Sequence, residues 1–195
     1  MNTLRLTTNK KDLETAKNLL KKGEIIAVPT DTVYGLIALS SNANARDKVY
    51  ELKNRNKEKK LILLCSNSEM VKRLATEFTE NAKNLSDKFW PGPLTLILKV
   101  NNESVGFRVP KHDAVIKLIS SLNEPVISTS ANLTNEESAT NYETVKKYFD
   151  GKVSAIIDGG ETSLKVASTI LDATASPHKI LREGAIAAAQ LLPSA

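Results

Sequence analysis

The feature that most constrains the fold of this chain is the alternation of short apolar runs with amphipathic segments of helical period. Such an order of strands and helices is typical of an α/β protein. Two pairs of predicted strands, 24–29 with 36–40 and 94–100 with 105–109, follow one another without an intervening helix. Strands joined in this way pair antiparallel, so we expect a mixed β-sheet flanked by helices. No internal repeat or low-complexity linker is found, which predicts a single domain over residues 1–195.

Capping residues predict where several helices begin. Asn9, Thr79 and either Ser66 or Asn67 stand directly before segments of helical period, and their side chains can accept hydrogen bonds from the first turn. Near the other end of the sequence, the run AIAAAQLL over 185–192 predicts a final helix.

The composition is that of an ordinary globular protein, with 41% apolar and 25% charged residues and a net charge of +5. The single cysteine, Cys65, excludes an intramolecular disulfide and a cysteine-based zinc cluster, and its apolar neighbours predict that it is buried. No signal peptide or membrane-spanning run is found, so we expect a soluble, cytoplasmic protein without a membrane partner. The basic balance favours anionic ligands such as nucleotides, pyrophosphate or nucleic acid.

The two common nucleotide motifs, G-x-G-x-x-G and G-x-x-x-x-G-K-[ST], are absent from the sequence. A bound nucleotide would therefore need other groups to neutralise its phosphates. The candidates are Lys53 and Arg55 after a predicted helix, Arg108 within a predicted strand, and Arg182 in LREG. Each is more commonly a surface or salt-bridged residue, and a buried arginine needs an anion or a carboxylate partner. Together they could form one anion-binding cleft, but their spacing does not show that they converge.

Two polar segments follow predicted strands. In PTDTVYGL, the side chains of Thr30, Thr32 and Tyr34 alternate and would point to one side of an extended stretch. In STSAN, Ser130 and Asn132 alternate in the same way. Hydroxyl and amide groups suit a small polar ligand, but both segments are also compatible with ordinary turns.

Catalysis by a serine nucleophile would need a base, and the chain offers only His112 and His178. Both lie in connections that we expect to be exposed. No spacing of histidines and carboxylates supports a metal site in the protein itself.

Seven ordered segments resemble the YrdC/TsaC family, the threonylcarbamoyl-AMP synthases. They are PTDTVYGL, the K-x-R of Lys53 and Arg55, WPGPLTLIL, FRVP, STSAN, STILD and LREGAI. The resemblance runs from about residue 5 to about residue 187 and fits the short, single-domain form of the family. Two departures are Asn56, where proline is usual, and the loop NLTNEES, which lacks the usual glycine.

The resemblance implies a twisted mixed sheet around an open, positively charged cleft. It also implies formation of threonylcarbamoyl-AMP and pyrophosphate from L-threonine, bicarbonate and ATP. Partner enzymes would then transfer the threonylcarbamoyl group to tRNA. Such chemistry rests on positioning and fixed positive charge, with Mg²⁺ carried by the nucleotide phosphates and no metal site in the protein.

The resemblance also implies roles for individual residues. Lys53 and Arg55 would be catalytic and would contact the carbamate and the phosphates. The nucleotide would further contact Ser130, Asn132 and Arg182. The threonine and carbamoyl end would be bound by Thr30, Thr32, Tyr34, Arg108 and Ser168.

Three other interpretations are compatible with the sequence. A non-catalytic protein could hold tRNA or rRNA in the same basic cleft, and weak RNA binding could also accompany the enzymatic activity. A related enzyme could form carbamoyl-AMP, although that chemistry occurs in larger chains. An ordinary nucleotide hydrolase would consume ATP without threonine.

Overall fold

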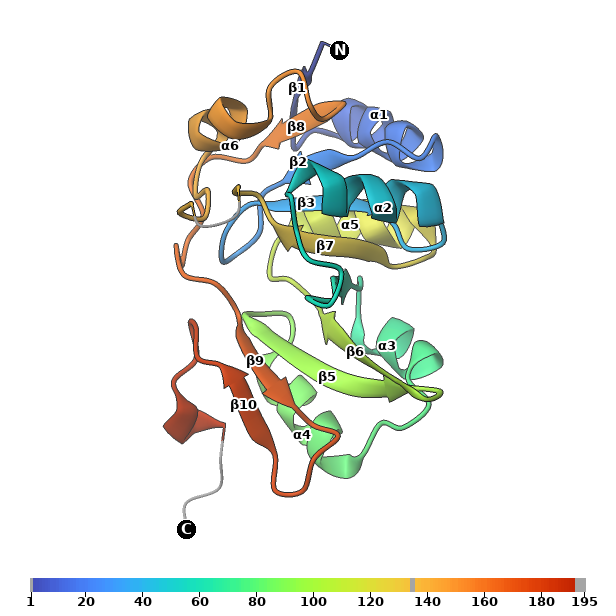
Figure 1. The fold of residues 1–195 in the computed structure, drawn as a ribbon, viewed down its shortest axis with the longest axis vertical. Helices are drawn as coiled ribbons and strands as arrows, with labels where there is room; N and C mark the ends of the chain where they lie inside the picture. Colours follow the sequence, from blue (N-terminus) through green and yellow to red (C-terminus); the bar gives the residue numbers. More distant parts are fainter. Residues whose placement is uncertain (1, 134–135, 192–195) are drawn as a thin grey trace.

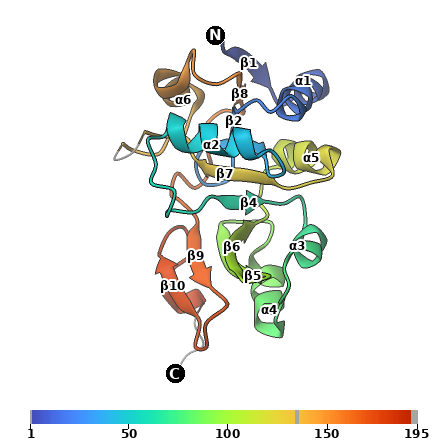
Figure 2. The ribbon, with the colours of Figure 1, turned by 45° about the vertical axis from the view of Figure 1, so that its right-hand side comes forward.

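The computed structural model describes residues 2–133 and 136–191, which build one mixed sheet. The strands of this part of the chain run in the spatial order β1-β8-β2-β3-β7-β4-β6-β5-β9-β10 (Figures 1 and 2). Their bounds are β1 (Leu4–Thr7), β2 (Ile26–Val28), β3 (Gly35–Leu39), β4 (Ile62–Leu64), β5 (Leu94–Val100), β6 (Glu103–Arg108), β7 (Val126–Ser130), β8 (Ala155–Asp158), β9 (Thr169–Asp172) and β10 (Lys179–Arg182). The predicted α/β class is confirmed.

The sheet contains both parallel and antiparallel pairs of strands. The two expected antiparallel pairs, β2 with β3 and β5 with β6, are both present. The short strand β4 pairs antiparallel with β7 and parallel with β6, and so joins the two parts of the sheet seen one above the other in Figure 1. Residues far apart in sequence therefore meet near β4.

The helices are α1 (Lys10–Lys21), α2 (Ala43–Leu52), α3 (Ser68–Leu74), α4 (Glu80–Phe89), α5 (Asp113–Leu122) and α6 (Tyr142–Phe149). The predicted caps Asn9 and Thr79 accept hydrogen bonds from the first turns of α1 and α4, and Asn67, rather than Ser66, caps α3. Each cap satisfies a backbone N–H that would otherwise lack a partner within the helix. Among the described residues, no helix is long and apolar enough to cross a bilayer.

Buried apolar side chains form two clusters, one with α1, α3, α4 and α5 and one with α2 and α6. Strand residues alternate between them: Ile37 belongs to the first cluster, and Leu36 and Ala38 belong to the second. This alternation buries both faces of β3 and explains why its sequence is apolar throughout. Cys65 is fully buried as predicted, and its burial raises the pKa of the thiol to about 12.

The final helix predicted over 185–192 is wrong. Within the described part of this segment, only the 3-10 turn Ala188–Gln190 forms. The hydroxyl of Thr169 donates to the carbonyl of Ile186 at 2.7 Å and accepts from the Ile186 N–H at 3.0 Å. These contacts hold the start of the segment against β9, so tertiary structure overrides the high helix propensity of its alanines.

Candidate functional site

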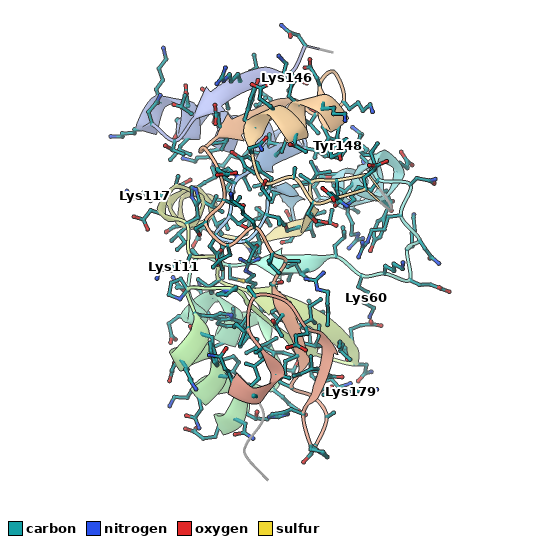
Figure 3. The ribbon with its side chains drawn as sticks, turned by 90° about the vertical axis from the view of Figure 1, so that its left-hand side faces the viewer. Lys60, Lys111, Lys117, Lys146, Tyr148 and Lys179 are labelled. Atoms are coloured by element: carbon teal, nitrogen blue, oxygen red, sulfur yellow. The ribbon has the colours of Figure 1, made fainter. Side chains whose placement is uncertain are left out.

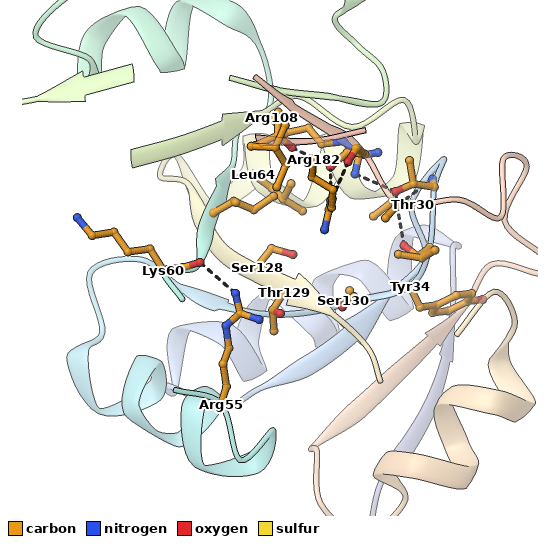
Figure 4. A pocket seen from close by; sticks show the side chains of 18 residues that line it. Thr30, Tyr34, Arg55, Lys60, Leu64, Arg108, Ser128, Thr129, Ser130 and Arg182 are labelled. Atoms are coloured by element: carbon orange, nitrogen blue, oxygen red, sulfur yellow. Dashed lines mark hydrogen bonds between the residues drawn. The ribbon is translucent and has the colours of Figure 1, made fainter. Parts of the chain in front are cut away.

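A pocket lies beside β4, between the β3–β7 part of the sheet and the β5–β9 part (Figure 4). It has a cavity volume of about 130 Å³ and is partly open to solvent. Among the described residues, its lining includes three arginines and one lysine but no aspartate or glutamate. The remaining lining is mostly hydroxyl groups and aliphatic side chains, a composition suited to an anionic ligand.

The pocket brings together most of the residues singled out from the sequence. Those in its lining are Thr30, Thr32, Tyr34, Arg55, Arg108, Ser130, Ser168 and Arg182. Lys53 and Asn132 are not part of the lining and lie behind it. Sequence reasoning missed Lys60, Ser128 and Thr129, which also line it.

Lys53 follows the last turn of α2 and is only 4% exposed. Its ammonium donates to the carbonyl of Ser130 at 2.5 Å and to Oδ1 of Asn132 at 3.2 Å. The Ser130 hydroxyl also donates to Oδ1 of Asn132, at 2.6 Å. Lys53 therefore connects the end of α2 to the polar segment after β7. Burial, and then the nearby charge of Arg55, lower the pKa of Lys53 to about 8.

Arg55 is held by the loop that it begins. Its Nε donates to the carbonyl of Lys59 at 2.8 Å and Nη2 donates to that of Lys60 at 3.3 Å, and its guanidinium points into the pocket (Figure 4). Asn56, where the family usually has proline, accepts from the N–H of Glu58 at 2.8 Å through Oδ1. This hydrogen bond between side chain and backbone fixes the loop where a proline ring would otherwise do so. The Lys60 amine points away from the pocket and pairs with Glu103.

Arg182 and Ser168 form the opposite wall. Nε and Nη2 of Arg182 donate to the Ser168 carbonyl at 3.1 and 2.7 Å, and Nη2 also donates to the Ser168 hydroxyl at 3.2 Å. Burial, and then repulsion from Arg55, lower the pKa of Arg182. Within the described residues, neither Arg55 nor Arg182 pairs with a carboxylate. Both arginines retain N–H groups that can bind a ligand, because a guanidinium carries five donors.

Arg108 is buried, and its partner is Asp31, a residue that sequence reasoning did not select. Nη2 of Arg108 donates to Oδ1 of Asp31 at 2.5 Å, Nη1 to the Thr32 hydroxyl at 2.8 Å, and Nε to the Gly92 carbonyl at 3.0 Å. Burial is the largest influence on the pKa of Arg108 and lowers it, while Asp31 opposes this effect. The expectation that a buried arginine needs an anionic partner is confirmed. The sequence feature that could have identified Asp31 is a lone carboxylate shortly after a buried strand.

The hydroxyls of the 30–34 segment already have partners. Thr30 donates to the carbonyl of Val33 at 2.7 Å and lies 3.0 Å from the Thr32 hydroxyl. The Tyr34 hydroxyl donates to the carbonyl of Gly160 at 2.8 Å and accepts from the N–H of Gly159 at 3.2 Å. Tyr34 therefore fixes the 159–160 turn with its hydroxyl, and it belongs to the second buried cluster.

The expectation that both histidines are exposed is wrong. His112 and His178 are half-buried. Burial lowers the pKa of His112, and its Nδ1 has no hydrogen-bond partner in the described part of the chain. Neither histidine lines the pocket, and no group of three or more potential metal ligands lies together within residues 2–133 and 136–191.

Five exposed lysines from different parts of the chain do not gather at one place. Lys60, Lys111, Lys117, Lys146 and Lys179 project at different levels and toward different sides of the molecule (Figure 3). The three pocket arginines lie much closer together, since Arg182 contributes to the lowered pKa of Arg108 and Arg55 to that of Arg182. Fold and pocket thus define an α/β protein with a localised, cation-lined pocket.

The sequence profile of the Sua5/YciO/YrdC family, described as telomere recombination, matches residues 18–184, and the chain belongs to this family. It is similar to the threonylcarbamoyl-AMP synthase of Pyrococcus abyssi, with 37% identity over 181 residues that cover 88% of this chain and 53% of the relative. The Bacillus subtilis threonylcarbamoyl-AMP synthase is 36% identical over 197 residues, covering 95% and 57%. The chain thus spans about half the length of these curated relatives.

Solved structures have the same fold. Pyrococcus abyssi Sua5 complexed with L-threonine superposes with a TM-score of 0.87 and 36% identity, over 94% of this chain and 57% of that one. Escherichia coli YciO superposes with a TM-score of 0.83 over 94% of both chains, and its 24% identity supports the fold alone. The family membership inferred from the ordered motifs is confirmed.

Proposed function

We propose that this chain is a threonylcarbamoyl-AMP synthase, a nucleotidyltransferase acting on L-threonine, bicarbonate or CO2, and ATP. The observation that carries the proposal is the single pocket in which Arg55, Arg108 and Arg182 meet a hydroxyl-rich wall without a carboxylate in the lining. Relatives that carry this activity in their names, and a relative's structure complexed with L-threonine, support it. The proposal treats residues 1–195 as one family domain.

The reaction has two steps. The deprotonated amine of threonine attacks the carbon of bicarbonate, and water leaves to give a carbamate. A carbamate oxygen then attacks the α-phosphorus of ATP, the bond to the β-phosphate oxygen breaks, and pyrophosphate leaves. No protein nucleophile is needed. Alignment of the anions and stabilisation of charge on the phosphoryl oxygens supply most of the rate enhancement.

The pocket suggests a division of roles along its length. Arg55 and Arg182 have no carboxylate partner in the described residues, so they would contact the phosphates and stabilise the charge of the departing pyrophosphate. Ser130 would hydrogen-bond the nucleotide. Lys53 and Asn132, which lie behind the lining, would act by fixing the Ser130 segment and by adding positive charge.

The threonine and carbamoyl end would lie at the other side of the pocket. Arg108 and Thr32 would face the amino-acid carboxylate, while Thr30 and Tyr34 shape that end. Ser168, held by Arg182, would face the junction between the carbamoyl group and the phosphate. Magnesium would enter with the nucleotide, whose phosphate oxygens are ligands that it prefers.

The product is a mixed carboxylic–phosphoric anhydride and would be handed to enzymes that transfer the threonylcarbamoyl group to tRNA in the cytoplasm. Weak contact of the chain with tRNA is part of this proposal.

Pyrophosphate release with and without L-threonine tests the function. We expect release from magnesium-ATP and bicarbonate to depend on threonine and to be absent with D-threonine. ATP turnover that is independent of threonine would indicate a hydrolase. Salt-sensitive RNA binding without any turnover would indicate an RNA-binding protein and would contradict the proposal.

A further inference from the structure

Asp31 lies between two pocket residues but does not itself line the pocket. Thr30 and Thr32 are part of the lining, whereas the Asp31 side chain is 4% exposed and points behind the wall. A carboxylate in the lining would repel an anionic ligand. Placed behind Arg108, it can instead act on the ligand through the arginine.

The Asp31 side chain holds the far end of β6. Its Oδ1 accepts from Nη2 of Arg108 at 2.5 Å and from the backbone N–H of Lys111 at 3.0 Å. The Arg108 guanidinium is further fixed by the hydroxyl of Thr32 and by the carbonyl of Gly92. A buried guanidinium without its carboxylate would have to recruit water or move. Asp31 therefore determines where the remaining N–H groups of Arg108 point.

The Asp31 backbone holds a second segment. Its carbonyl accepts from the N–H of Leu164 at 3.0 Å and from the hydroxyl of Ser163 at 3.1 Å. The same segment continues to Ala167 and Ser168, which line the pocket. One residue thus links the 30–34 loop, the end of β6 and the segment that leads into β9.

We propose that Asp31 is a positioning residue for the amino-acid end of the pocket, which orients Arg108 and Thr32 toward a carboxylate ligand and anchors the segment 163–168. This inference rests on the proposed function. It predicts a selective effect, because Asp31 contacts neither Arg55 nor Arg182 on the nucleotide side.

Asp31→Asn keeps the size of the side chain and the backbone contacts but removes the charge that Arg108 faces. We expect the KM for L-threonine to rise about tenfold or more, as for loss of a charge-assisted contact, while the KM for ATP stays within about twofold. Steady-state kinetics with each substrate varied, and titration calorimetry with threonine alone, measure this. A merely structural role would lower the melting temperature and leave both KM values unchanged.

Asp87→Asn is the matched control, since Asp87 lies 3.8 Å from Lys83 in an exposed ion pair on α4, outside the pocket. We expect wild-type values for both substrates. Asp31→Glu keeps the buried charge and shifts the carboxylate by one methylene. This variant tests the same positioning role if Asp31→Asn does not fold. It should raise the threonine KM in the same selective way, though less.

A double-mutant cycle tests whether Asp31 acts through Arg108. Arg108→Lys keeps the charge but loses the planar fork, so it should also raise the threonine KM. In the double variant the two effects should be clearly less than additive, because both remove the same fixed guanidinium.

Equal threonine KM values for wild type and the Asp31 variants would overturn this inference alone. A wild-type protein that neither binds threonine nor releases pyrophosphate would overturn the proposed function and the inference with it.

Discussion

Arg55 and Arg182 are the pocket arginines whose charge no carboxylate offsets within the described residues, whereas Arg108 is paired with Asp31. The proposed chemistry places the developing phosphate charge next to these two groups. Their mutual repulsion, which contributes to the lowered pKa of Arg182, is relieved when an anion binds between them. Arg55 is therefore the most direct residue-level test of the pocket.

Replacing Arg55 with alanine should reduce threonine-dependent ATP consumption by about two or more powers of ten, because it removes charge stabilisation of the phosphoryl oxygens. Circular dichroism and the melting temperature should stay near wild type, since within the described residues the Arg55 side chain donates to the carbonyls of Lys59 and Lys60 in its own loop. The control is Lys57→Ala, two residues after Arg55, which removes an exposed cation that pairs with Asp47. This variant should retain full turnover. Near-wild-type turnover of Arg55→Ala would contradict the assignment of Arg55 to the phosphates.

Lys53 makes the stability of the protein depend on pH in a defined window. Its pKa is about 8 in the folded protein, against 10.5 for an ordinary lysine, so above about pH 8 the unfolded chain binds more protons at this site. The cost of burying the charge is thus fully present below pH 8 and is relieved as the pH rises toward 10.5. Stability should therefore gain from Lys53 deprotonation across that interval.

Urea unfolding of wild type and Lys53→Met, compared at several pH values, isolates this contribution because the other titrating groups are shared. The wild-type free energy of unfolding should rise relative to the variant by up to about 1.4 kcal/mol per pH unit within the window. Parallel pH profiles for the two proteins would contradict a buried, charged Lys53.

At this scale, the sequence identified the types of site residue better than their positions. Arg55, Arg108 and Arg182 line one pocket, but Lys53 lies behind the wall and Asp31 was missed. Both differences depend on which way a side chain points in a loop or after a helix end, and this is decided by long-range contacts with β6 and β7 rather than by local pattern.

At the scale of elements, the turn after β10 packs closely against the backbone of the segment that forms one wall of the pocket. A Cβ added to Gly184 would lie 2.2 Å from the carbonyl oxygen of Ala167 and 2.6 Å from the carbonyl carbon of Ser168. These are backbone atoms of the segment that lines the pocket, so they cannot move aside without displacing Ser168 and Arg182. Only glycine fits this approach.

Gly184→Ala should therefore lower both the stability and the turnover, the latter by more than the fraction of unfolded protein explains. Asn67→Ala is the control for destabilisation alone, because it removes the cap of α3 away from the pocket and should cost about 1 kcal/mol. Thermal melts and turnover measured well below both melting temperatures separate the two effects. Full turnover in Gly184→Ala would show that the wall tolerates displacement.

The elements themselves were largely predictable. Strands and helices carry local signals, such as the caps Asn9, Asn67 and Thr79 and the apolar runs of the buried strands. The exception is the segment from 185, whose local preference is helical but whose Ile186 is bound by Thr169. Strand order was not predictable, because β4 joins β7 to β6 through pairings between residues distant in sequence.

For the whole molecule, we infer that one pocket brings three substrates together. Pairing of distant strands at β4 brings the 30–34 loop, the 55–60 loop, the end of β7 and Ser168 to one place (Figure 4). Arg108 is paired with Asp31, whereas Arg55 and Arg182 have no carboxylate partner among the described residues. This asymmetry suits a ligand whose charge is concentrated on its phosphates.

The most direct test is the origin of the carbon between threonine and AMP. The protein is incubated with magnesium-ATP, L-threonine and ¹³C-bicarbonate, and the products are separated rapidly and analysed by mass spectrometry. We expect threonylcarbamoyl-AMP that carries the isotope, with one pyrophosphate released for each molecule formed. AMP or ADP accumulating without a labelled adduct, or at the same rate without threonine, would contradict it.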